Sequence, residues 1–177
     1  TKGEAEAGQN APVEDVDPNR LAKANVWAAK YFQKNLRDNK LGKYARDYLA
    51  GRQISPESIE KWQLGLAINQ PDGLLREAGE NKGVLKLLEQ AGLILGRNQD
   101  KFVNRLMFTI TDVTGRVIGF GGRTLDETGA KYINSPTTVL FDKSNSLYGL
   151  EQARHEDHGG VCRTNVHGHH RRGRHLP

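Results

Sequence analysis

Five polar or aromatic residues in the middle of the chain have side chains suited to binding single-stranded nucleic acid. In the expected strand Lys131-Tyr132-Ile133, continued by Asn134, alternation puts the Tyr132 ring and the Asn134 amide on one face. A ring can stack on a base, and an amide can hydrogen-bond a phosphate or a base edge, while cations bind phosphates. The candidate site residues are Arg52, Arg123, Lys131, Tyr132 and Asn134.

Each of these features also has a purely structural interpretation. Arg123 follows the glycine cluster 119–122, which we expect to close a strand. Glycines there allow a polymer to approach the backbone, but they also suit a simple β-bulge. Tyr132 could be a half-buried core residue before an Asn-Ser-Pro turn, and Arg52 an ordinary surface cation after a helix end. The residue types alone leave these alternatives open.

Catalytic and metal-binding patterns are scarce. All six histidines and the single cysteine, Cys162, lie between residues 155 and 177, so no Ser-His-acid or Cys-His arrangement is indicated in the body of the chain. The segment His167–His170 with Cys162 could supply metal ligands, but nothing around it suggests the packed shell that a structural site needs. In residues 21–154 the acidic residues are scattered, and only Asp126 and Glu127 are adjacent. We therefore assign no catalytic and no metal residue.

The elements that must position the candidate residues fall into two groups. Capping signals and apolar spacing predict helices near residues 18–38, 42–50, 55–62, 73–78 and 82–90. After residue 100 the apolar pattern becomes strand-like, with an expected hairpin of 102–110 and 116–120 and a third strand at 131–133. A last helix is expected at 147–154. Short helices followed by a small antiparallel sheet predict the α+β class.

Composition divides the 177-residue chain into three parts. Residues 1–20 carry a net charge of −3 and few apolar side chains, which predicts a flexible acidic linker. Residues 21–154 hold the positive balance, and residues 155–177 form an irregular tail rich in histidine and arginine. No transmembrane or secretory pattern is present, and one cysteine excludes an internal disulfide. We expect a cytoplasmic, monomeric protein with an anionic partner and no membrane association.

Five blocks, taken in order, closely resemble bacterial DnaG-type DNA primase. The resemblance covers about residues 21–154 and is specific because of the order of its motifs. The blocks are Tyr48-Leu49-Ala50-Gly51-Arg52 with 59–65, Asn104–Ile110, Gly115–Arg123, Lys131–Pro136, and Phe141–Lys143 with 147–154. This match implies the N-terminal subdomain of the RNA-polymerising core, in which the five candidate residues match positions lining a single-stranded DNA groove.

The resemblance also implies parts that these residues do not contain. In the family, a zinc-binding domain precedes the core, a TOPRIM domain holds Mg²⁺ or Mn²⁺ on clustered carboxylates, and a C-terminal domain docks on the replicative helicase. The implied partners of the present segment are the single-stranded DNA template and the RNA–DNA hybrid. No cofactor is expected in this chain itself, and we expect the chain alone to be inactive in primer synthesis.

Two other interpretations remain. A stand-alone nucleic-acid-binding module without catalysis would show the same groove, and a gene that continues in frame into an acidic metal-binding segment would exclude it. A metal-binding protein organised by the histidine-rich tail is the third. The tail departs from the family. If the codons for residues 166–170 are read one base later, they permit Tyr-Met-Asp-Ile-Ile, which resembles the acidic motif of the TOPRIM domain. This motivates the hypothesis that the tail is an out-of-frame, non-native reading of that domain.

Overall fold

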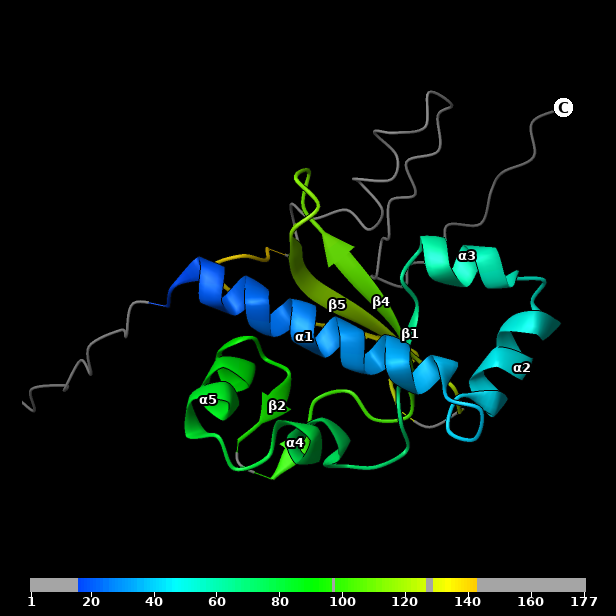
Figure 1. The fold of residues 1–177 in the computed structure, drawn as a ribbon, viewed down its shortest axis with the longest axis horizontal. Coiled ribbons are helices and arrows are strands. Elements are labelled where there is room, and N and C mark those ends of the chain that lie inside the picture. The colour runs from blue at the N-terminus through cyan, green and yellow to red at the C-terminus, as the bar shows by residue number, and fades with distance from the viewer. Residues whose placement is uncertain (1–15, 97, 127–128, 143–177) are drawn as a thin grey trace, which may run out of the picture.

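The computed structural model describes residues 16–96, 98–126 and 129–142, which form a helical part followed by a small sheet (Figure 1). The linker residues 1–15, the helix expected at 147–154 and the tail lie outside the described residues. None of the described helices is long and apolar enough to cross a membrane. The elements are α1 Pro18–Arg37, α2 Lys43–Gly51, α3 Pro56–Lys61, β1 Gly65–Ala67, α4 Gly73–Ala78, α5 Lys82–Gln90, β2 Ile94–Leu95, β3 Gln99–Asp100, β4 Arg105–Thr111, β5 Val117–Thr124 and β6 Tyr132–Asn134.

The five helices predicted between residues 18 and 90 are confirmed. Side-chain caps fix the starts of α1, α3 and α5. The Asp17 carboxylate accepts the Asn19 amide at 2.9 Å, and Pro18 occupies the first helical turn. Ser55 caps α3 in the same way through the Ser58 amide. The helix start predicted at Pro18 is confirmed, so residues 18–20, which the linker range 1–20 also included, belong to α1.

The sheet has the order β1-β4-β5-β6 and is antiparallel throughout. The hairpin of β4 and β5 and the third strand, β6, were predicted. The edge strand β1 was not, because three residues are too few to show an alternating pattern. A separate pair, β2 and β3, was also missed.

The glycine cluster lies inside β5 and does not end it. Gly121 pairs with Phe108 and Gly122 with Met107 in regular register, and the one irregularity of this hairpin falls between Ile110 and Thr111. The expectation that the cluster closes the strand is therefore wrong. A bulge does border the cluster, because Ile110 pairs with Gly119 and Thr111 with Val117, which leaves Ile118 of β5 without a partner in the register. A Cβ at Gly122 would lie 2.8 Å from the Phe102 ring, so this glycine serves close packing of the core.

The main core lies between α1 and one face of the sheet. Figure 1 shows α1 crossing β4 and β5, with α4 and α5 beside it. The rings of Phe32 on α1 and Phe120 on β5 meet edge to face, with centroids 5.5 Å apart. Two buried amides add polar contacts to this layer: the Asn25 side chain donates to the Val117 carbonyl and that of Asn35 to the Leu66 carbonyl, both at 3.2 Å.

A second, smaller core covers the opposite face of the sheet at the β1 edge. Ala45 and Leu49 of α2 pack with Leu66 of β1 and Leu106 of β4, all of them buried. Strand alternation directs Leu66 and Leu106 away from the α1 side. This contact fixes the C-terminal end of α2 beside the face of β5 that carries Arg123.

Gly65 permits the closest approach of a helix to the sheet, and its substitution tests that constraint. A Cβ at this position would lie 2.5 Å from Phe32 Cβ and 2.9 Å from the Phe32 carbonyl carbon. We expect Gly65→Ala to lower the free energy of unfolding by about 1–3 kcal/mol because the helix must shift. Gly51→Ala at the end of α2 is the matched control, since its Cβ would contact nothing within 4 Å. The measurement is urea denaturation of both variants. Equal stability of Gly65→Ala and Gly51→Ala would contradict the close packing at Gly65.

Asp100 is a buried carboxylate that joins β3 to the first turn of α4. Its two oxygens accept the amides of Leu74 at 2.7 Å and Leu75 at 3.1 Å. Burial raises the pKa of Asp100 to about 6, although these hydrogen bonds act in the opposite direction. A pKa above that of the unfolded chain means that Asp100 contributes stability below about pH 4, which is lost as the pH rises through about 6.

Asp100→Asn should remove this pH dependence. Each pKa unit corresponds to about 1.4 kcal/mol, so the stability advantage of the wild type over the variant should shrink by about 2 kcal/mol between pH 4.5 and pH 7.5. The measurement is urea denaturation of both proteins across that range. An advantage that is constant with pH would show that Asp100 is ionised with an ordinary pKa in the folded protein.

Candidate nucleic-acid interface

A cavity of about 430 Å³ lies between the C-terminal end of α2 and the end of β5. Three of the five sequence-predicted residues line it: Arg52, Arg123 and Lys131. They are brought together from positions 52 to 131 of the chain by the packing of α2 on the sheet. Its other lining residues are Tyr48, Thr124, Leu125, Asp126 and Gly129.

The backbone positions of Arg52 and Arg123 direct both side chains toward the cavity. Arg52 is the C-cap residue of α2, and its amide donates to the Leu49 carbonyl at 3.0 Å. Arg123 lies on β5 directly opposite Tyr132 on β6, so both side chains stand on the same face of the sheet. Because Leu49 is buried against that sheet, α2 carries Arg52 toward Arg123.

Cations and rings alternate along the cavity. The guanidinium carbon of Arg52 lies 4.7 Å from the centroid of the Tyr48 ring, and that of Arg123 lies 5.4 Å from the same centroid. Arg123 is also 5.7 Å from the Tyr132 ring. These distances are within the range of cation–π attraction. The apolar spacing of Ala45, Tyr48 and Leu49 in the predicted helix 42–50 indicates a buried Tyr48, and its ring does pack partly against the second core. The signal for its second role was its position four residues before Arg52 on one helix face.

Arg123 has a buried hydrogen-bond donor without a partner among the described residues. Its side chain is half-buried, and its Nε has no hydrogen-bond partner among the described residues although water does not reach it. A buried donor without a partner is costly, by roughly 1–3 kcal/mol. An anion bound to this guanidinium would offset that cost, which makes Arg123 the strongest candidate for a phosphate contact.

The other two predicted residues lie beside the cavity. The Tyr132 ring is 46% exposed, which leaves surface on which a base can stack. Asn134 does not line the cavity; it lies opposite Gly121, where an added Cβ would sit 3.3 Å from Asn134 Oδ1. Tyr132, beside Arg123, and Asn134, two residues further along β6, therefore lie on the same face of the sheet, as their alternation predicted.

Asp126 places one negative charge at the rim of the cavity, and sequence reasoning did not assign it a role there. Its carboxylate accepts the Asn104 side-chain amide and the Thr124 hydroxyl, each at 2.7 Å. The Tyr44 hydroxyl in turn donates to Asn104 at 3.1 Å, and burial together with the Asp126 charge raises the pKa of Tyr44. This network holds the carboxylate at the rim, where it reduces the positive potential.

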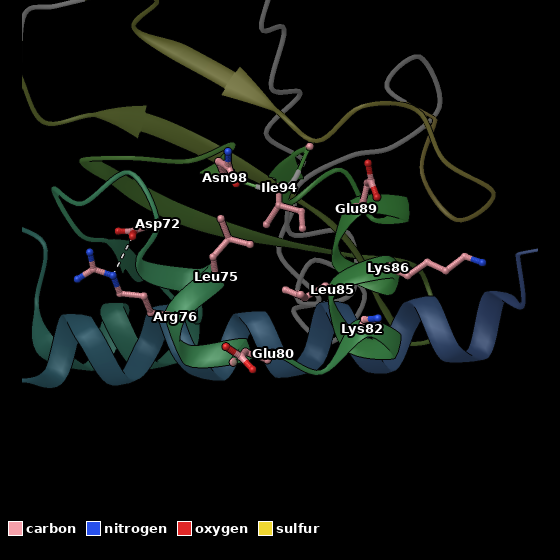
Figure 2. Close-up of a pocket in the computed structure, with 12 residues that line it drawn as sticks. Asp72, Leu75, Arg76, Glu80, Lys82, Leu85, Lys86, Glu89, Ile94 and Asn98 are labelled. Carbon is pink, nitrogen blue, oxygen red and sulfur yellow. Dashed lines mark hydrogen bonds and ion pairs between the residues drawn. The ribbon is translucent and has the colours of Figure 1, made fainter.

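Metal ligands do not gather in the described residues: no group of three or more histidine, cysteine or acidic side chains there could hold an ion. A larger groove of about 1180 Å³ lies between α4, α5 and β2, and none of the five candidates is among its lining residues (Figure 2). Its rim mixes both signs of charge, including the Asp72–Arg76 ion pair at 2.8 Å. We place the candidate site at the smaller cavity because three cations line it against one carboxylate, whereas the larger groove has as many acidic as basic lining residues.

The fold defines the class of the protein: an α+β domain with helices on both faces of an antiparallel sheet and a cationic cavity at one end of it. The sequence pattern of the family described as the DNA primase catalytic core, N-terminal domain, matches residues 31–154. The chain therefore belongs to the bacterial DnaG-type DNA primases and carries the N-terminal domain of their catalytic core.

Individual relatives agree with this assignment. The chain is 44% identical over 147 residues to the DNA primase of Deinococcus radiodurans, covering 80% of this chain and 25% of that protein. It is 42% identical over 130 residues to that of Haemophilus influenzae, covering 71% of this chain and 21% of that protein. The chain thus spans about a fifth to a quarter of these relatives.

Solved structures extend the similarity to the fold. A structure of the DnaG primase catalytic domain bound to single-stranded DNA has a TM-score of 0.74 and 36% identity, covering 78% of this chain and 46% of that one. The Escherichia coli primase catalytic core has a TM-score of 0.72 and 37% identity, covering 77% and 45%. These values confirm the predicted α+β class and the resemblance to primase.

Proposed function

We propose that this domain holds single-stranded template DNA, and the RNA–DNA hybrid made on it, during primer synthesis by a DNA primase. The observation that carries the proposal is the convergence of Arg52, Arg123 and Lys131 on one cavity, with the exposed ring of Tyr132 beside it. Cations supply contacts to phosphates, and an exposed ring supplies a stacking platform, which are the two parts of a single-strand binding surface.

The similar structures support the choice of partner. One of them is described as bound to single-stranded DNA, and another, of the Mycobacterium tuberculosis RNA polymerase domain, as a complex with double-stranded DNA. The latter has a TM-score of 0.71 and 32% identity to this chain. Nucleic acid is therefore the expected partner, and the exposed ring favours single-stranded bases because a base stacked inside a duplex has no free face.

The rest of the primase reaction belongs to other parts of such a protein. Nucleotidyl transfer needs divalent ions on clustered carboxylates, which the family supplies in its TOPRIM domain, and zinc belongs to a separate template-recognition domain. The described residues offer no donor set that fits either metal. We propose a cytoplasmic, monomeric protein at the replication fork, with helicase docking by a further domain.

Within this proposal each residue has a defined task. Arg52, Arg123 and Lys131 neutralise successive phosphates, the Tyr132 ring stacks on a base, and the Asn134 amide hydrogen-bonds a phosphate or a base edge. Phosphate contacts and stacking act on any sequence, because every nucleotide has a phosphate and every base has a flat face. The surface would hold the template in register without choosing among bases.

Binding to a labelled oligonucleotide, followed by fluorescence anisotropy across a salt series, tests these tasks. Three phosphate contacts on a single strand imply a slope of about −2 in log affinity against log salt. Arg123→Ala should weaken binding to all sequences and flatten the slope by about 0.7. Tyr132→Ala should cost about 1–3 kcal/mol of binding free energy and leave the slope nearly unchanged.

Lys23→Ala is the matched control for charge, because Lys23 is an exposed cation on α1 that does not line the cavity. The arginines of the tail are the same in every variant, so their non-specific binding cancels in the comparison. Equal affinities of the Arg123, Tyr132 and Lys23 variants would contradict the assignment of DNA binding to this cavity. The fold and the family would not be affected.

Primer synthesis by the 177-residue chain is expected to be absent. Phosphoryl transfer to a growing strand requires metal ions positioned by grouped carboxylates, and residues 21–154 contain only scattered ones. The measurement incubates the purified chain with template, nucleotides and Mg²⁺ or Mn²⁺, beside a complete primase as the positive control. Any template-dependent RNA product from the chain alone would refute the division of labour proposed here.

A further inference from the structure

Tyr48 is the one ring that contacts cations from two different elements of the described structure. Arg52 comes from the end of the same helix, and Arg123 from β5, yet both guanidinium carbons lie within 5.4 Å of its centroid. The side chain itself is half-buried, with its apolar surface against the α2 core. The ring is therefore fixed by packing while its π-surface is used by both cations.

This arrangement solves an electrostatic problem. Two guanidinium groups that line one small cavity repel each other, and each long side chain loses rotamer freedom when it is held in place. A tyrosine ring presents negative faces that attract both groups, more strongly where water is excluded. Among the described lining residues Asp126 also offsets the repulsion, but its carboxylate is held by Asn104 and Thr124 and does not orient the two guanidinium groups toward each other.

We infer that Tyr48 is a positioning residue that holds the Arg52 and Arg123 guanidinium groups in the geometry that binds neighbouring phosphates. The inference rests on the proposed function of this cavity. Tyr48 acts through the two arginines and does not itself touch the nucleic acid. The alternatives are a tyrosine that stacks on a base, and a tyrosine that only fills the core.

The first measurement needs no nucleic acid. In ¹⁵N relaxation measurements on the whole chain, the Nε–Hε groups of Arg52 and Arg123 should have restricted motion on the picosecond-to-nanosecond timescale. Tyr48→Leu should increase the motion of both groups toward that of a free arginine, while Tyr48→Phe should leave it restricted because the ring remains. Tyr48→Met is the second ring-free variant, since its flexible side chain fills irregular space if leucine destabilises the fold. Unchanged motion of both arginines in the ring-free variants would overturn the inference.

The second measurement is DNA binding by the same variants across a salt series. Tyr48→Leu should weaken binding about tenfold and flatten the salt slope by 0.7 or more, because phosphate contacts of two arginines are lost together. Tyr48→Phe should bind like the wild type, and Tyr48→Leu should have little further effect in an Arg52→Ala, Arg123→Ala background. A loss of affinity at constant salt slope would instead identify Tyr48 as a stacking residue and overturn the inference.

The two measurements separate this inference from the proposed function. If Arg52→Ala and Arg123→Ala bind like the wild type while the ring-free variants still increase the motion of the arginine side chains, the cavity does not bind DNA but Tyr48 does position the arginines. If the arginine variants lose affinity and the ring-free variants change neither arginine motion nor salt slope, the proposed function stands and the role of Tyr48 falls. Thermal denaturation of every variant confirms that the compared proteins are folded.

Discussion

The packing of α1 against the sheet is the constraint on which the other elements depend. Gly65 allows β1 to approach the helix backbone, and Phe32 then reaches Phe120 in the middle of β5. The buried Asn25 and Asn35 amides donate to carbonyls of the sheet, which pairs these polar groups within the layer. Among the described residues α1 thus closes one face of the sheet, and the candidate site lies on the opposite face.

The site exists because α2 covers that opposite face incompletely. Ala45 and Leu49 pack on β1 and β4, and the helix ends before it reaches β5 and β6. The gap at its C-terminal end is the cationic cavity. Carbonyl groups at a helix C-terminus carry partial negative charge and favour a cation there, which suits Arg52 as the C-cap residue. The length of α2, the order of the strands and the charge at the helix end thus all contribute to the cationic cavity.

Local signals were enough to predict the helices, whereas contacts between distant segments were not visible in the sequence. Asp17-Pro18 and Ser55-Pro56 set the starts of α1 and α3, and the predicted boundaries of the five described helices agree with the structure to within one or two residues. β1 has no such signal, since its place depends on Phe32 more than thirty residues earlier. The glycine cluster was misinterpreted for the same reason, because Phe102 is what requires Gly122 to lack a side chain. At the site, residue chemistry indicated the cations and the exposed ring, and Tyr48 was missed because aromatic residues at helical spacing usually belong to a core.

The composition of the cavity also limits what it can distinguish. Reading a base edge requires acceptors and donors in a fixed arrangement, whereas the described lining offers mainly donors and rings. Asp126 is the exception, and its carboxylate is already engaged by Asn104 and Thr124. Its negative charge lowers the attraction for phosphate, so a strand would be held more weakly than by the three cations alone. If this surface holds template DNA as proposed, such moderate, sequence-independent binding would suit a strand that advances by one nucleotide at a time, because each step breaks and reforms the same contacts.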